Sequence, residues 1–149
     1  MRLTGPKRFA PALLLTVALT AALVFGAADD TPHAALARVA SALGQNEPQE
    51  ALAVFDKSGA DFGAIEAAIG ALTAQAEILC AIEIVEEKTT GSDKVLDTDW
   101  FLQLKPSGQG GEATRRRERV SITMRLVRGK WRIVTMKPLS ILGPIVLNR

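Results

Sequence analysis

The segment 115–139 alternates apolar and polar residues on both sides of Gly129. Side chains in a strand point alternately to opposite faces, so this pattern predicts an antiparallel hairpin with one face on a core. A two-residue turn at 128–129 would pair Leu126 with Trp131 and would bury that tryptophan. The alternating apolar positions are Val120, Ile122, Met124, Leu126, Trp131 and Ile133. The segment constrains the fold strongly, yet it holds no arrangement of reactive side chains.

The N-terminal segment has the composition of a secretory signal. Basic residues precede an apolar run at 9–28, and small residues end that run before Asp29. This pattern predicts a signal peptide at 1–28 that is removed on export, leaving one domain at 29–149 in the periplasm or outside the cell. The alternative is that residues 9–28 remain as an inner-membrane anchor, since about 20 apolar residues span a bilayer. Contact with a membrane is expected only through this segment.

The charge of the domain differs from that of the whole chain. The full sequence has a formal net charge of +2, with 18 Lys and Arg against 16 Asp and Glu. Three of the basic residues and none of the acidic ones lie in the first 28 positions, which leaves a net charge of −1 for the rest. The basic run 115–119 lies in an expected strand, so its side chains would be divided between two faces, with Asp97 and Asp99 on the outward one. We therefore expect a charge-paired outer face and no nucleic-acid partner.

Cys80 is the only cysteine of the chain, so no internal disulfide is possible. It lies in an apolar run at 78–85, with no basic residue beside it in sequence. A thiol in such surroundings behaves as a small apolar side chain. We therefore expect Cys80 to be buried and unreactive.

The order of elements predicts an α+β fold. Helix-start signals occur at Thr31, Asn46 and Asp61, and apolar residues recur at helical spacing after each of them. Four stretches with strand character follow, at 77–88, 94–105, 116–127 and 130–137. Because the helices precede all the strands, we expect an α+β fold in which three N-terminal helices pack on one face of a four-stranded antiparallel meander sheet.

The registers of the first three strands follow from making their apolar faces coincide. A three-residue loop ending at Gly91 would pair Ile84 with Leu96. Across the long loop between the second and third strands, the apolar faces coincide if Leu102 pairs with Glu118. The loop itself, PSGQGGEA, does not dictate this register.

The helix–helix–helix–meander order, the hairpin VRGKWRIVTMKPLSIL and the segment EPQEALAVFDKSGADFGAI together resemble exported bacterial members of the nuclear transport factor 2-like family. This family has a cone-shaped α+β fold, also described as SnoaL-like or cystatin-like. The resemblance covers residues 31–142. It implies that the helices and the concave face of the sheet enclose a pocket, which some members use for catalysis, and that members often pair through their sheets.

Five residues of the expected concave face are candidates for binding a small apolar ligand. Their hydroxyl, carboxyl and indole groups would give polarity or an aromatic wall to such a site. The alternative is a packed interior whose hydroxyl groups are satisfied within the protein. The candidates are Thr98, Trp100, Glu118, Trp131 and Thr135.

The sequence favours a non-catalytic role. Enzymes similar to this family, such as ketosteroid isomerases and scytalone dehydratases, use Asp with Tyr, or paired His with Asp. This chain has no Tyr, and its one histidine, His33, is expected to be exposed. We assign no catalytic residue, no metal ligand and no cofactor. The sequence therefore predicts a module that binds a small ligand or a protein; the alternative is an isomerase, dehydratase or hydrolase with Glu118 as its acid–base group.

The outer face of the expected sheet also carries apolar side chains, which would be unusual on a monomer. Leu79 and Phe101 would lie side by side there. This predicts a homodimer through the outer face, whereas the tail 141–147 could instead cover the patch and leave a monomer. The dimer-face candidates are Leu79, Phe101, Val134 and Met136.

Overall fold

The computed structural model describes residues 30–108 and 111–146, and its elements occur in the expected order. The expected signal segment, 1–28, lies outside the described residues. Within the described part, no helix is long and apolar enough to cross a membrane. The helices are α1 (Pro32–Gly44), α2 (Pro48–Leu52), α3 (Phe62–Gln75) and the 3-10 helix η1 (Ser140–Leu142), and the strands are β1 (Ala76–Thr90), β2 (Asp93–Pro106), β3 (Thr114–Val127) and β4 (Lys130–Lys137).

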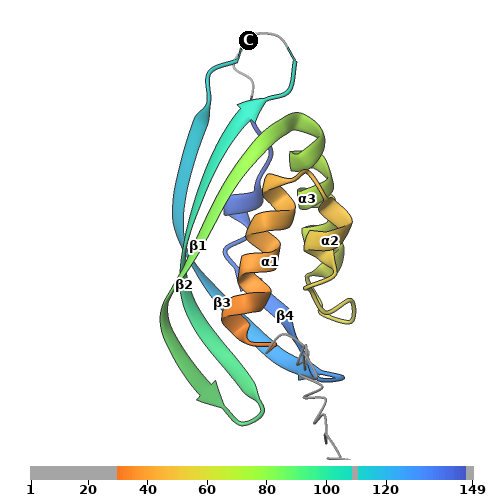
Figure 1. Ribbon diagram of the computed structural model, residues 1–149, viewed down its shortest axis with the longest axis vertical. Helices are drawn as coiled ribbons and strands as arrows, with labels where there is room; N and C mark the ends of the chain where they lie inside the picture. The colour runs from red at the N-terminus through yellow and green to blue at the C-terminus, as the bar shows by residue number, and fades with distance from the viewer. Residues whose placement is uncertain (1–29, 109–110, 147–149) are drawn as a thin grey trace, which may run out of the picture.

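The four strands form one antiparallel sheet in the order β1-β2-β3-β4, as a meander requires. Figure 1 shows this sheet as a long curved layer with the helices on its concave side. The helix α1 begins where the sequence predicts, because the Thr31 Oγ1 accepts a hydrogen bond from the backbone N–H of Ala34 at 3.0 Å and Pro32 occupies the first turn. The observed architecture confirms the α+β prediction.

The second helix is shorter than its apolar spacing indicates, since α2 ends at Leu52. The chain then extends along the free edge of β4, where Phe55 forms a parallel bridge with Ile133. Ile133 donates its N–H to the Val54 carbonyl at 2.9 Å and accepts the N–H of Asp56 at 2.8 Å. These hydrogen bonds take the place of further helical ones. Val54 and Phe55 are buried, and the segment 53–58 covers the free edge of β4.

The hairpin of β3 and β4 has the predicted register, with Leu126 opposite Trp131 and Met124 opposite Ile133. Arg128 and Gly129 both have positive φ, at 52° and 77°. Two consecutive positive φ values are what a two-residue type I′ turn requires, and its twist matches that of the strands. The prediction made from the local pattern is therefore confirmed.

The other two predicted registers are each wrong by two residues. Ile84 lies opposite Thr98 instead of Leu96, because the turn at 91–92 has two residues and a bulge follows Ile84. Leu102 lies opposite Arg116 instead of Glu118. A shift of two residues preserves the direction of every side chain, so the inner and outer faces are the predicted ones at these positions.

A second bulge alters the face assignment near the end of β4. The register changes between Thr123 and Met124, where Val134 is the extra residue of the partner strand. As a result Met136 lies opposite Ile122 and is fully buried, while Thr135 lies opposite Thr123 on the outer face. Met136 is therefore not a dimer-face residue and Thr135 is not a residue of the concave face, because one inserted residue reverses the alternation.

The C-terminal tail returns to the concave side of the sheet. Arg116 donates hydrogen bonds to the carbonyls of Ile141 at 3.1 Å, Gly143 at 2.5 Å and Pro144 at 2.9 Å. This guanidinium holds η1 against α3 and β3, where Ile141 and Leu142 are buried. The tail from Ile141 to Leu142 is therefore part of the core and does not cover the outer face.

Candidate functional site

The interior of the cone is built around Trp100, which has no solvent exposure. Its Nε1–H donates to the Thr98 Oγ1 at 2.9 Å, and that hydroxyl donates to the Val120 carbonyl at 2.7 Å. Thr98 is also fully buried. Every polar atom of this pair thus has a partner inside the protein, as buried polar groups require. The arrangement is a packed interior with a satisfied hydroxyl, which was the alternative to a ligand pocket.

Glu118 lies opposite Trp100 in the sheet and is partly exposed. The Ser140 Oγ lies 2.9 Å and 3.1 Å from its two carboxylate oxygens and donates to them. Ser140 is the first residue of η1, so the carboxylate helps to attach this turn to β3. This position gives Glu118 a structural contact with η1.

The remaining two pocket candidates lie elsewhere. Trp131 is only partly buried, at the hairpin end of the sheet, where the Lys94 Nζ is 5.1 Å from the ring centroid. Its expected burial against Leu126 is wrong, since Leu126 is 50% exposed. Thr135 lies on the outer face. The structure therefore brings together Thr98, Trp100 and Glu118, but not Trp131 or Thr135.

His33 is exposed on α1, as expected from its place in the first turn. Among residues 30–108 and 111–146, no group of three or more His, Cys, Asp or Glu side chains is placed to hold a metal ion.

The outer face of β2 and β3 carries three ion pairs. Arg117 lies 2.6 Å from Asp99, Arg119 lies 2.9 Å from Asp97, and a third pair joins Arg125 to Asp93 at 2.9 Å. Hydrogen bonds from the arginines lower the pKa of Asp99 and of Asp93 from their ordinary values. These contacts confirm the predicted charge-paired face.

Apolar side chains lie beside these ion pairs, toward the β1 edge. Leu79 is 56% exposed and Val85 is 48% exposed. Phe101 lies opposite Ala81, so Leu79 is its diagonal neighbour and not its direct partner as predicted. A shallow hollow of about 260 Å³ crosses this area, lined by Ala81, Ile82, Glu83, Asp99, Phe101 and Arg117. Val134, at the bulge of β4, is partly exposed.

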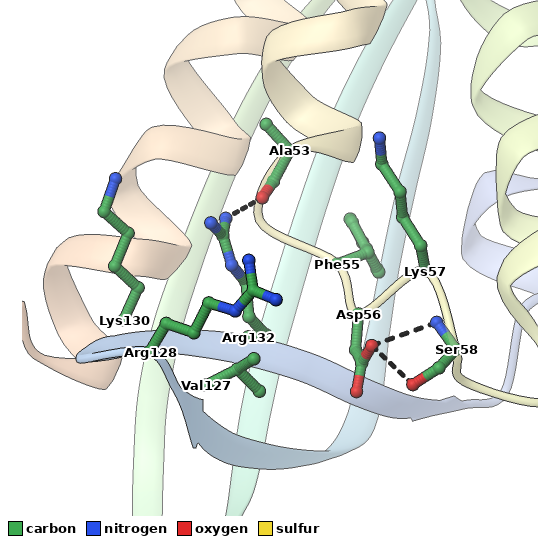
Figure 2. Close-up of a pocket in the computed structure, with 9 residues that line it drawn as sticks. All are labelled: Ala53, Phe55, Asp56, Lys57, Ser58, Val127, Arg128, Lys130 and Arg132. Atoms are coloured by element: carbon green, nitrogen blue, oxygen red, sulfur yellow. Dashed lines mark hydrogen bonds between the residues drawn. The ribbon is translucent and has the colours of Figure 1, made fainter.

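The sequence analysis missed a larger hollow of about 680 Å³ between the β3–β4 hairpin and the segment 53–58. Figure 2 shows Arg128 and Arg132 turned toward that segment, with Lys57 and Lys130 on either side. Arg128, Lys130 and Arg132 lie in or beside the hairpin turn, and this cluster of basic residues is visible in the sequence. Lys57 joins them only because the segment 53–58 lies along β4. The lining residues are Ala53, Phe55, Asp56, Lys57, Ser58, Val127, Arg128, Lys130 and Arg132.

No protein-family model matches this chain, and no curated protein matches it. Solved structures do. A scytalone dehydratase-like protein from Novosphingobium aromaticivorans is 9% identical with a TM-score of 0.62, covering 70% of this chain and 77% of that one. A ketosteroid isomerase-like protein from Erwinia carotovora atroseptica is 13% identical with a TM-score of 0.59, covering 75% and 95%. A Nostoc punctiforme protein of unknown function with a cystatin-like fold is 13% identical with a TM-score of 0.53, covering 70% and 84%. At these identities the similarity is one of fold alone.

Proposed function

We propose that this chain, whose fold is the cone of the nuclear transport factor 2-like proteins, is an exported, non-catalytic interaction module that pairs with a second copy through the outer face of its sheet. The observation that carries the proposal is a contrast between the two faces. The buried side chains of the sheet lie on its concave face, whereas the outer face of β1 exposes Leu79, at 56%.

The packed interior supports a non-catalytic role. A small substrate would have to displace Trp100, whose indole N–H is already bonded to Thr98. Glu118, the acid–base candidate, is engaged by the hydroxyl of Ser140. A catalytic base must reach the proton that it abstracts in a bound substrate, and this carboxylate instead attaches η1 to the sheet.

The exposed apolar side chains support an interface on the other face. Leu79 points away from the helices, and the hollow lined by Ala81 and Phe101 lies in the same area. The described tail packs on the concave side, with Ile141 buried there, so it leaves this patch open. A second copy would remove these apolar surfaces from water.

The charge distribution favours a second copy as the partner. On the outer face, Glu83 of β1, Asp99 of β2 and Arg119 of β3 lie in one row across the sheet, as do Leu79, Gln103 and Arg115. In a two-fold pairing with its axis along β2, the β1 strand of one copy meets the β3 strand of the other. Glu83 of each copy then faces Arg119 of the other, which favours this partner over one with a uniformly charged surface.

The test is sedimentation of the purified protein at micromolar concentration. We expect a dimer mass, and we expect Leu79→Arg to raise the dimer dissociation constant at least about tenfold, because it places a guanidinium opposite Arg115 of the second copy. Leu126→Arg is the matched control, since Leu126 is similarly exposed, at 50%, but lies away from the proposed interface. A monomer mass for the unmutated protein, or an equal response of the two variants, would contradict the proposal.

Export has its own test. If residues 1–28 direct secretion, fractionation of the source cells should recover the protein in the periplasm or the medium. Intact-mass measurement should then place its N-terminus within a few residues of Asp29. Recovery of the full-length chain in the membrane fraction would contradict removal of the segment and would favour the anchor at 9–28.

A further inference from the structure

The hollow between the β3–β4 hairpin and the segment 53–58 gathers four cationic side chains around one opening. Arg128, Lys130 and Arg132 come from the hairpin, and Lys57 comes from the facing segment. This site lies apart from the residues that line the outer-face hollow, so it does not depend on the proposed dimer.

The positive charge of the hollow is not matched by nearby carboxylates. The ion pairs formed within residues 30–108 and 111–146 use other cations than these four. Asp56 is the one acidic residue that lines the hollow. Its carboxylate accepts hydrogen bonds from the Ser58 hydroxyl at 2.7 Å and from the Ser58 N–H at 3.0 Å, and Figure 2 shows it directed toward Ser58. Four cations therefore surround a space that contains one carboxylate, already bonded.

The same two hydrogen bonds from Ser58, aided by Arg125 and Arg132, lower the pKa of Asp56. This group therefore stays ionised at neutral pH, and the hollow carries a formal charge of +3 from its four cations and one carboxylate. A monovalent anion would leave most of this charge uncompensated. An anion with two or more negative charges compensates it better.

The walls of the hollow are positioned before any ligand binds. Arg132 donates to the Ala53 carbonyl, which orients its guanidinium across the opening. Arg128 belongs to the tight turn and has a φ of 52°. The segment that carries Lys57 is attached to β4 by the two backbone bonds of Ile133. The Arg132 guanidinium, held in this way, presents its other N–H donors to phosphate oxygens.

The lining is not entirely polar. Val127 is partly exposed beside Arg128, and Ala53 is exposed at the end of α2. The volume of about 680 Å³ also exceeds what a single phosphate group fills. From this combination we propose that the hollow binds a small phosphate ester carrying at least two negative charges, with its organic part against the apolar wall.

The test is calorimetric titration of the purified protein with two probes, inorganic pyrophosphate and water-soluble dihexanoyl phosphatidic acid. We expect saturable binding that weakens as sodium chloride is added, because salt screens exposed charges. Tighter binding of the lipid analogue would support the proposal, because only that probe has an organic part to place against the apolar wall. Equal or tighter binding of pyrophosphate, or no binding of either probe, would overturn it.

The decisive variant is Arg128→Asn, because asparagine tolerates the positive φ of this turn. We expect it to raise the dissociation constant about tenfold, the loss of one charge-assisted contact. Lys137→Gln removes one positive charge from an exposed position of β4 outside the hollow, and should leave binding unchanged. Equal affinities of Arg128→Asn and the unmutated protein, with both folded by circular dichroism, would overturn the proposal.

Discussion

Replacing Trp100 with alanine is expected to lower the free energy of unfolding by about 3–5 kcal/mol. Trp100 is the largest fully buried side chain and lies in the sheet between Ile82 and Glu118. Its removal leaves a cavity inside a rigid layer, and it also removes the N–H that the Thr98 hydroxyl accepts at 2.9 Å. The measurement is urea denaturation followed by circular dichroism, with the midpoint and the slope both compared.

The chain offers a matched control in its other tryptophan. Trp131 is partly buried at the hairpin end, where it contacts the ammonium group of Lys94. Trp131→Ala should therefore cost only about 1–2 kcal/mol, because less surface is lost and solvent can occupy the space. Equal losses for the two variants would show that the interior of the cone is not packed around Trp100.

Cys80 is expected to react with iodoacetamide at pH 8 about a thousandfold more slowly than an exposed cysteine. Burial raises the pKa of its thiol to about 12, because a thiolate is poorly solvated on the concave side of β1. Only the thiolate is the nucleophile, so a rise of about three pKa units lowers the fraction of thiolate at pH 8 about a thousandfold. Mass spectrometry of timed samples measures the rate.

The pH dependence of the labelling rate shows in which direction the pKa of the Cys80 thiol is shifted. The labelling rate should rise about tenfold per pH unit between pH 8 and 10 without reaching a plateau, since these values lie below the raised pKa. The neutral thiol also favours the folded state: this contribution is complete below the ordinary thiol pKa and is lost as the pH rises toward about 12. Labelling in urea is the control and should be fast. Cys80 is half-buried, and a plateau near pH 9 in the folded protein would contradict the raised pKa of its thiol.

Two local features, the turn of the β3–β4 hairpin and the start of α1, were predicted correctly. The register of Leu126 with Trp131 follows from a two-residue turn, whose geometry depends only on the residues beside Gly129. The start of α1 follows from Thr31 and Pro32 in the same way. The exposure of His33 was also predicted, because helical periodicity alone sets which side of α1 faces the sheet.

The register of β1 with β2 was wrong because the turn at 91–92 has two residues instead of the predicted three, and because a bulge follows Ile84. The extra residue after Ile84 lengthens β1 relative to β2, and alternation along one strand does not reveal it. At Val134 the same effect turned Met136 into the core and Thr135 outward. A face assignment that counts residues from the turn fails beyond such a point.

The sequence by itself therefore determined the order of elements and the hairpin at Gly129. For the interior of the cone it left two alternatives, a ligand pocket and a packed interior with satisfied hydroxyl groups. Only the tertiary structure decided that Trp100 and Thr98 close the interior, since the hydrogen bond from the Thr98 hydroxyl to the Val120 carbonyl needs β3 beside β2. The tertiary structure also forms the hollow lined by cationic residues. Lys57 lies near the hairpin only because the bridge between Phe55 and Ile133 holds its segment along β4. Contacts between residues distant in the chain depend on how layers pack, and no local periodicity specifies that packing.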